Sequence, residues 1–141
     1  MAAVAHAIAD TRALARLRHP VVAEVLGPLI EAGLVATCGL IEFEVGWAIR
    51  TPIELGQVRA DRELGYEWLP TLDEDWRRAL DVQTRLWQAG LVRAVGFPDL
   101  LIAAVAEREC VTVLHYDGDY DHINAITGQP VQWIVPRGTV P

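Results

Sequence analysis

Short apolar runs alternate along the chain with longer stretches in which apolar and polar positions repeat with helical spacing. A run of roughly four to eight apolar or β-branched residues is typical of a buried strand. Five such runs predict strands: Val4–Ala9, Leu34–Thr37, Tyr66–Leu69, Val111–His115 and Val131–Val135. The segments between them predict helices: Thr11–Arg18, Val21–Ala32, Gly39–Arg50, Ile53–Gly65, Thr71–Gln88, one that begins at Pro98 and a short one that ends near Gly128.

Local signals indicate where some of these helices begin and end. Pro20 suits the first turn of a helix, where its missing N–H is not needed, and Gly33 suits the position just after the end. Thr71 and Glu74 have the spacing of a capping box. The helix that they open has an apolar stripe, which predicts burial for Trp76, Leu80, Val82, Leu86 and Trp87.

Strands that are separated by helices predict a parallel sheet covered on both faces. We therefore expect an α/β fold with three layers, α/β/α, and a central parallel sheet of four or five strands flanked by helices. A length of 141 residues favours a single domain that spans residues 1–141.

Acidic residues occupy equivalent places after the predicted strands and at the beginnings of helices. In a parallel sheet the carboxyl ends of the strands converge on one edge, where ligands bind. The candidates for that edge are Asp10, Glu44, Asp99 and Asp117, with Asp119 as a close fifth and Asp121 as a weaker sixth. Glu42 lies two residues from Glu44, so one helix cannot present both on the same face.

Several carboxylates at one place repel one another unless a cation joins them. Like charges about 4 Å apart repel by about 4 kcal/mol at an effective dielectric constant of 20. Hard oxygen ligands favour Mg²⁺ or Mn²⁺, one or two ions per site, and such ions support hydrolysis of phosphodiesters. Taken singly, Asp99 also fits a helix-dipole partner, and Asp117-Gly118-Asp119 also fits a turn.

Composition narrows the classes of function. The formal charge of −7 argues against a general electrostatic grip on nucleic acid, and all twelve basic side chains are arginines. No apolar run is long enough to span a membrane, and the first residues lack the basic segment of a signal peptide, which predicts a cytoplasmic protein. Cys38 and Cys110 lie in apolar segments and are expected to be buried, reduced thiols.

Four segments together resemble the motifs of PIN-domain proteins, and specifically of VapC-type toxins. They are Ala9–Leu14, which resembles the opening aspartate motif of the family, Ala36–Val45, Gly96–Ala104 and Val113–Tyr120, in the family's order over nearly the whole chain. The resemblance implies that Asp10, Glu44, Asp99 and Asp117 form the catalytic site and hold Mg²⁺ or Mn²⁺, with Asp119 supporting. Thr11 and Arg12 are expected to bind substrate.

The resemblance also implies a function. VapC-type toxins are metal-dependent endoribonucleases of type II toxin–antitoxin modules, which cleave structured RNA such as tRNA or rRNA and stop translation. It implies a VapB-like antitoxin partner, a toxin homodimer, and contact with DNA only through the antitoxin complex. Trp47, or Leu14 and Leu17, are candidates for an interface.

Arg12 departs from the family pattern, which usually has serine after the first Asp-Thr pair. An arginine that points into the site would compete with metal, and one that points outward would contact RNA phosphate. Two alternatives follow. One is a weakly active or inactive PIN-fold binding module, and the other is a phosphoaspartate protein, either a receiver or a phosphatase, which would need a lysine that this chain lacks.

Overall fold

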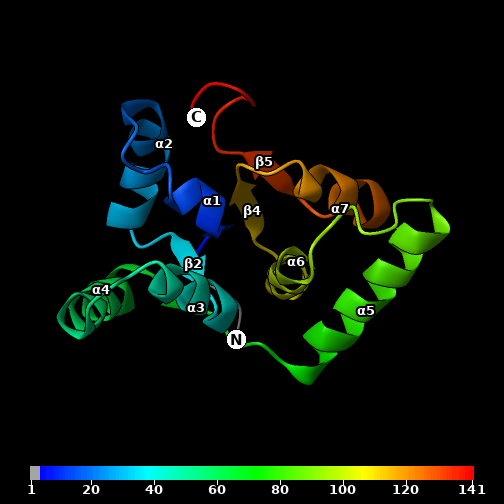
Figure 1. Cartoon of the computed structure of the whole chain (residues 1–141), viewed down its shortest axis with the longest axis horizontal. Helices are drawn as coiled ribbons and strands as arrows, with labels where there is room; N and C mark the ends of the chain where they lie inside the picture. Colours follow the sequence, from blue (N-terminus) through cyan, green and yellow to red (C-terminus); the bar gives the residue numbers. More distant parts are fainter. Residues whose placement is uncertain (1–3) are drawn as a thin grey trace.

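The computed structural model describes residues 4–141, and in this part of the chain five short strands form one parallel sheet. Figure 1 shows the sheet at the centre with helices on either side of it. The strands are β1 (Ala7–Ala9), β2 (Val35–Thr37), β3 (Glu67–Trp68), β4 (Thr112–His115) and β5 (Val131–Trp133). Their order in the sheet is β3-β2-β1-β4-β5, and every pairing is parallel. The predicted fold class is confirmed.

Seven helices flank the sheet in residues 4–141. They are α1 (Thr11–Leu14), α2 (Pro20–Glu31), α3 (Gly39–Trp47), α4 (Pro52–Gly65), α5 (Asp73–Gln88), α6 (Phe97–Glu109) and α7 (Asp119–Thr127). Most boundaries lie within a few residues of those predicted. The structure has a much shorter first helix than predicted, because the Asp10 side chain caps only one helical turn before the chain bends at Ala15.

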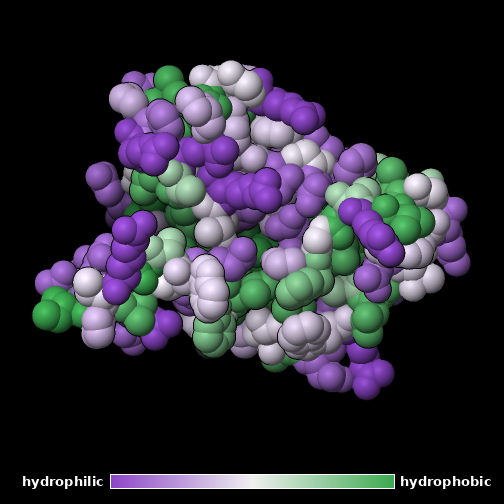
Figure 2. All heavy atoms as spheres, in the orientation of Figure 1, coloured by the Kyte–Doolittle hydropathy of each residue, from purple (hydrophilic) through white to green (hydrophobic). Residues whose placement is uncertain are grey.

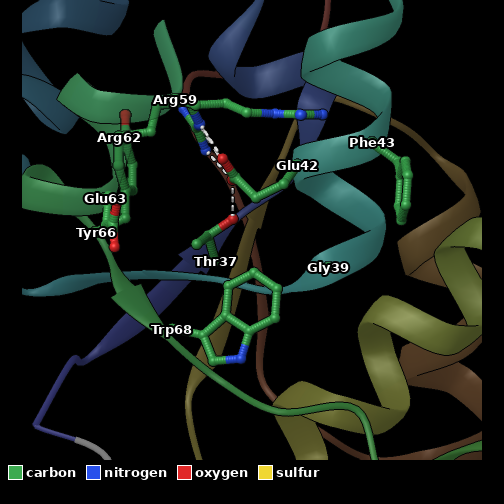
Figure 3. Close-up of a pocket in the computed structure, with 9 residues that line it drawn as sticks. All are labelled: Thr37, Gly39, Glu42, Phe43, Arg59, Arg62, Glu63, Tyr66 and Trp68. Carbon is green, nitrogen blue, oxygen red and sulfur yellow. Dashed lines mark hydrogen bonds and ion pairs between the residues drawn. The ribbon is translucent and has the colours of Figure 1, made fainter. Parts of the chain in front are cut away.

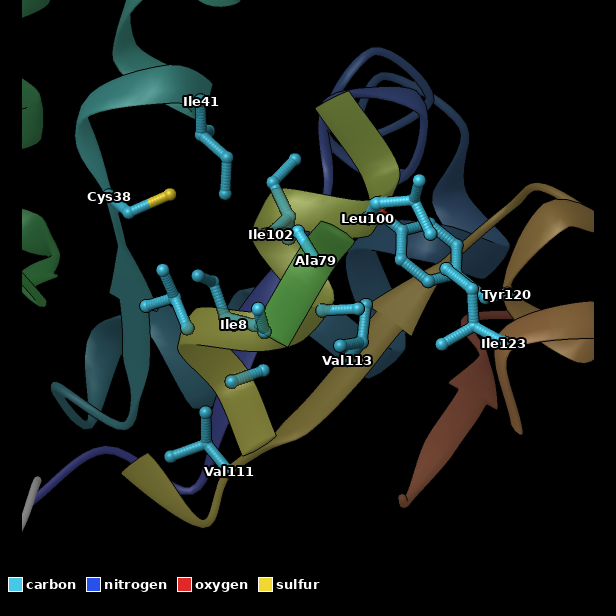
Figure 4. Packing of buried hydrophobic residues seen from close by; sticks show 14 of the residues in the cluster. Ile8, Cys38, Ile41, Ala79, Leu100, Ile102, Val111, Val113, Tyr120 and Ile123 are labelled. Carbon is cyan, nitrogen blue, oxygen red and sulfur yellow. The ribbon is translucent and has the colours of Figure 1, made fainter. Parts of the chain in front are cut away.

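Alternate residues of the central strands supply two separate apolar cores. Ile8 of β1 and Val113 of β4 point into the larger core, which is covered by α3, α5, α6 and α7 (Figure 4). Ala9 and Leu114 point into the smaller core under α1 and α2, together with Leu26. This alternation follows from the two-residue period of a strand, and it fixes the central strands in register.

The predicted capping box at Thr71 is wrong by one residue. Leu72 precedes the first residue of α5, and its backbone N–H donates to the carboxylate of Asp75 at 2.8 Å. Asp75 is buried and also accepts from Arg108, so a tertiary partner stabilises the local cap. The first turn of α5 contains three acids at 73–75, and the helix dipole favours them there.

Part of the predicted apolar face of α5 is exposed. Val82 and Leu86 are buried as expected, but Trp76 is 52% exposed and Leu80 is 63% exposed. The helix packs against α6 and α7, and only a narrow stripe of its surface is buried: Asp75, Ala79, Val82 and Leu86. Cys110 is also exposed, contrary to prediction, because it ends α6 in a left-handed conformation (φ 56°). Both cysteines are free thiols, as predicted.

No helix in residues 4–141 combines the length and the apolar character that crossing a membrane requires.

Candidate functional site

Three of the predicted acids converge at the carboxyl edge of the sheet. One carboxylate oxygen from each of Asp99, Asp117 and Asp119 lies within 4.8 Å of the others. Asp117 follows β4, Asp119 begins α7, and Asp99 lies in the first turn of α6. The parallel topology brings these three ends together, although Asp99 is separated from Asp117 by a whole helix and strand.

Asp10 lies next to this cluster at the end of β1. Its Oδ1 accepts hydrogen bonds from the backbone N–H groups of Arg12 (3.0 Å) and Ala13 (3.1 Å), so it caps α1 while it faces the other acids. Burial raises the pKa of Asp10 to about 6, and the nearby charges of Asp117 and Glu44 add to the rise against these two hydrogen bonds. In this environment the ionised form of Asp10 has lost part of its hydration, and a nearby cation would stabilise it.

Asp99 shows the strongest effect of crowding. Burial raises its pKa to about 8, and hydrogen bonding with Asp119 and the charges of Asp10 and Asp117 push it in the same direction. The Tyr120 hydroxyl, which is buried, also donates to Asp99 Oδ1 at 3.3 Å. In the metal-free site this environment favours the protonated form of Asp99, which lessens the repulsion among the clustered carboxylates.

Glu44 and Glu42 have different surroundings. Glu44 Oε1 accepts a hydrogen bond from the Thr11 hydroxyl at 3.1 Å, which holds it beside α1 on the side of Asp10. Glu42 points to the other side of α3, where Arg62 donates to both of its oxygens at 2.8 to 3.1 Å and Thr37 donates as well. Burial alone would raise the pKa of Glu42, but these bonds outweigh it and lower the pKa. Glu42 is therefore already neutralised within the fold.

The structure does not bring Asp121 into the cluster. It is exposed and accepts hydrogen bonds from the Trp133 indole N–H at 3.2 Å. The four histidines likewise provide no group in the acidic cluster, which contains only carboxylates among the described residues. His115 is fully buried behind Asp117, whose backbone N–H it accepts at Nδ1 (3.2 Å), and its Nε2 has no hydrogen-bond partner in residues 4–141.

Arg12 points toward the acids. Its Nη1 lies 3.2 Å from Asp117 Oδ2, while 65% of its side chain remains exposed. The contact satisfies charge but not hydrogen-bond geometry, since Asp117 Oδ2 is buried and has no hydrogen-bond partner in residues 4–141. The other oxygen of Asp117 accepts the backbone N–H of Asp119. Hydrophilic side chains gather around α1 and the nearby end of β4 on this face (Figure 2).

These observations fit a divalent cation. A buried carboxylate oxygen without a hydrogen-bond donor, beside two more carboxylates at ligand spacing, is an unfavourable arrangement that a hard cation relieves. Asp99, Asp117 and Asp119 have the spacing of a ligand set, and Asp10 lies close enough for its charge to raise the pKa of Asp99. The acidic cluster is thus suited to a divalent metal.

Sequence reasoning missed Tyr120 and the role of Thr11 as a partner of Glu44. Both are ordinary helix residues in the sequence, and their contacts join elements far apart along the chain. The one available signal was the position of Tyr120 three residues after Asp117, in the first turn of a helix that follows an acidic loop.

An apolar pocket of about 470 Å³ lies apart from the acids, between α3, α4 and β3 (Figure 3). Its walls include the exposed Phe43 and Trp68, and the Glu42–Arg62 ion pair lies at one side. The Trp68 ring lies against Gly39, where a side-chain carbon would come within 3.4 Å of it.

Comparisons with known proteins agree with this architecture. The family model described as PIN domain matches residues 7–126. Ribonuclease VapC21 of Mycobacterium tuberculosis is 42% identical over 130 residues, which cover 92% of this chain and 94% of the relative. Ribonuclease VapC51 of the same organism is 42% identical over 131 residues, which cover 93% and 94%.

Solved structures show the same fold. VapBC-5 from Mycobacterium tuberculosis, a member of the VapBC family of toxin–antitoxin systems, is 27% identical with a TM-score of 0.56, over 90% of this chain and 96% of that chain. DNA-bound VapBC from Salmonella typhimurium is 14% identical with a TM-score of 0.73, over 94% and 100%. From its sequence match, its parallel sheet and its acidic edge, this chain belongs to the PIN-domain family.

Proposed function

We propose that this protein is a Mg²⁺- or Mn²⁺-dependent endoribonuclease and the toxin of a type II toxin–antitoxin pair. The proposal takes residues 1–141 as one PIN domain that acts in the cytoplasm on structured RNA, tRNA or rRNA. The observation that carries it is the cluster of Asp99, Asp117 and Asp119 at ligand spacing. In this cluster the buried Oδ2 of Asp117 accepts no hydrogen bond from residues 4–141 and is balanced by the exposed Arg12 guanidinium at 3.2 Å. The names of the VapC ribonuclease relatives support the same activity.

We propose that Asp10, Glu44, Asp99 and Asp117 hold the metal, with Asp119 in support. The spacing of Asp99, Asp117 and Asp119, whose carboxylate oxygens lie within 4.8 Å of one another, supports this site, and the charges of Asp117 and Glu44 act on the neighbouring Asp10. When bound, the metal lowers the pKa of a water molecule and stabilises charge on the attacking and leaving oxygens of the phosphodiester. The chain holds its own ligands in place beforehand. The α1 N–H groups fix Asp10 and the Thr11 hydroxyl fixes Glu44, while the Tyr120 hydroxyl orients Asp99.

The raised pKa of Asp99 gives that residue a second role. A protonated Asp99 must lose its proton when a cation binds, so metal loading and proton release are linked. Thr11 and Arg12 lie at the outer side of the site, where the exposed guanidinium is in position to contact a substrate phosphate. An arginine suits this contact because its planar fork donates two parallel hydrogen bonds.

The partner in this proposal is a VapB-like antitoxin, and the complex would contact DNA through the antitoxin. The structural neighbours include VapBC of Salmonella typhimurium, bound to DNA, and VapBC-5 of Mycobacterium tuberculosis. On this chain we assign the antitoxin to the apolar pocket near Phe43 and Trp68, because exposed aromatic side chains lining a concave surface are typical of protein interfaces. The exposed stripe of α5, with Trp76 and Leu80, is then available for a toxin homodimer.

The direct test is to incubate the purified protein with total RNA, with and without Mn²⁺, and to map new 5′ ends. We expect a small set of metal-dependent cuts that are absent with Asp99→Asn. RNA that stays intact in the presence of Mn²⁺ would overturn the proposal.

A catalytically silent binding module is the second candidate, and the Arg12–Asp117 ion pair favours it, because a cation of the chain itself already neutralises one ligand. For that candidate, RNA would be bound but not cut, and Arg12→Ser would restore cleavage. The match to the PIN family leaves the phosphoaspartate alternative without support.

A further inference from the structure

The C-terminal segment 136–141 is fixed against Tyr116, the residue just before Asp117. The Tyr116 hydroxyl accepts the backbone N–H groups of Gly138 (2.9 Å) and Val140 (3.2 Å), and it donates to the carbonyl of Val140 (2.8 Å). Gly138 has φ +84°, a conformation that suits glycine. Three hydrogen bonds to one hydroxyl make this turn a built structure rather than a loose end.

Arg16, two residues after the end of α1, contacts the same tyrosine. The Arg16 guanidinium stacks on the Tyr116 ring at 4.4 Å from its centroid, and it donates to the carbonyls of Arg12 and Pro141. The C-terminal turn, Tyr116 and the segment after α1 therefore form one connected unit near the acidic cluster. The backbone of that turn is held at a defined place relative to Tyr116, the residue before Asp117.

Arg137 extends from this turn over the acidic loop, with its guanidinium 5.8 Å from the centroid of the Trp133 ring. Its Nη1 lies 3.8 Å from the point where Gly118 would carry a Cβ, so the guanidinium covers the turn between Asp117 and Asp119. Arg137 is exposed and forms no ion pair with any residue in 4–141. By contrast, the arginines of α5 are all neutralised by nearby acids.

Arg12 approaches the same loop from α1. The two guanidinium groups thus flank Asp117-Gly118-Asp119, one beside Asp117 and one over Gly118. Opposite charge favours both arginines beside the acidic cluster, and because both side chains are exposed they are also accessible to an anion from solution. A backbone phosphate that approaches this rim would meet both guanidinium groups. Without a cation there, the acids would repel that phosphate.

We propose that Arg137, held by the Tyr116 anchor, binds the RNA backbone phosphate next to the one that is cut, with Arg12 closing this phosphate site from α1. The inference rests on the proposed ribonuclease function. Guanidinium groups pair with phosphate through two parallel hydrogen bonds, and such contacts position a nucleic acid without reading its sequence. An acidic protein segment fits this site less well. The carboxylates would repel its side chains, and it has no phosphodiester for the metal site to attract.

Because backbone contacts are independent of sequence, the test does not need the natural RNA target. The probe is bulk tRNA with a fluorescent 3′ label, titrated with protein that carries Asp99→Asn to prevent cleavage. In this background we expect Arg137→Ala to weaken binding about fivefold to tenfold at low salt. It should also make the slope of log Kd against log salt shallower by roughly 0.7 to 0.9, the amount for one phosphate contact.

Three further variants separate positioning from general charge. Tyr116→Phe keeps Arg137 but removes its anchor, so it should weaken binding with no change in net charge. Arg137→Lys should keep the salt slope and recover part of the affinity, since lysine keeps the charge and loses the fork. Arg77→Ala is the matched control, because it removes one exposed arginine from α5 and should leave both quantities unchanged.

The outcomes are distinguishable from those of the proposed function. If Arg137→Ala and Arg77→Ala give the same salt slope and affinity, the phosphate site is wrong, even when wild-type protein cleaves total RNA. If Arg137→Ala weakens binding of a protein partner and leaves tRNA affinity unchanged, the surface is a protein contact and the inference is likewise overturned. If wild-type protein fails to cut RNA, the ribonuclease proposal fails whatever the binding data show.

Discussion

The guanidinium of Arg12 lies 3.2 Å from the carboxylate of Asp117, one of the three acids at ligand spacing. Burial leaves Asp117 Oδ2 with no hydrogen-bond donor in residues 4–141, so Arg12 supplies its charge balance. The same loop therefore has two possible counter-ions, one in the chain and one from solution.

Arg12→Ser should strengthen metal binding because it removes the competing cation. Since Arg12 is 65% exposed, water screens the ion pair and its free energy is about 0.2 to 1 kcal/mol, which corresponds to at most about a fivefold change in Kd. Calorimetric titration with Mn²⁺ measures this difference. A weaker Kd in the variant would mean that Arg12 helps to build the metal site.

The stability of the metal-free protein should fall as pH rises from about 4 to about 8. Asp99 has its pKa raised to about 8, so the folded state keeps a proton that the unfolded state releases above about 4, and rising pH favours unfolding. One pKa unit corresponds to about 1.4 kcal/mol, so even half of the shift would lower the free energy of unfolding by about 3 kcal/mol. Asp10, with a pKa raised to about 6, adds to the fall between about pH 4 and 6.

Asp99→Asn is the matched variant for this pH effect, since the amide has the same shape and does not titrate. Urea unfolding in the presence of a chelator, measured at several pH values, should give a flatter profile for Asp99→Asn than for wild type. Parallel profiles for the two proteins would show that Asp99 is ionised in the metal-free state.

Mn²⁺ or Mg²⁺ should raise the melting temperature, and by more at pH 8 than at pH 6. At a free metal concentration tenfold above Kd the native state gains about 1.4 kcal/mol. The gain is smaller at pH 6 than at pH 8, because at the lower pH the metal must displace protons from Asp99 and Asp10. Differential scanning fluorimetry at both pH values checks this. Equal shifts would argue that these two carboxyl groups are not ligands.

Glu42→Gln and Glu44→Gln should have opposite effects. Glu42→Gln breaks the ion pair with Arg62, whose side chain is only 11% exposed, and should destabilise the fold by about 2 to 3 kcal/mol with little change in metal affinity. Glu44→Gln should weaken Mn²⁺ binding and leave stability nearly unchanged, because only Thr11 donates to it. Chemical denaturation and calorimetry on both variants decide which glutamate is a ligand. A reversed pattern would assign the metal to Glu42.

Trp68→Ser and Trp76→Ser should separate the two proposed interfaces. The two tryptophans are similarly exposed, at 59% and 52%, so each substitution removes a comparable apolar surface. Trp68→Ser should reduce recovery of a co-expressed VapB-like partner, and Trp76→Ser should reduce toxin self-association in sedimentation velocity. The assignment of the pocket to the antitoxin fails if Trp76→Ser alone reduces partner recovery.

The sequence by itself determined the order of strands and helices, the parallel sheet and the approximate position of the acids. These follow from local periodicity and from the rule that parallel strands end on one edge, so Asp117 after an apolar run and Asp99 after Pro98 could be placed without coordinates. Only the tertiary structure decided the partners of side chains that the sequence could not orient, such as Glu42 and Glu44. Arg62, twenty residues away, engages Glu42 and leaves Glu44 to Thr11.

The same reason accounts for the other differences. Trp76 has the helical spacing of a core residue, but α6 and α7 cover only part of the face on which it lies. Arg12 could point toward or away from the acids, and the side chain extends to Asp117 because β1 and β4 are neighbours in the sheet. A hydrophobic pattern specifies that a residue can be buried, whereas the partners that bury, pair or desolvate it come from distant segments that only the folded chain brings together.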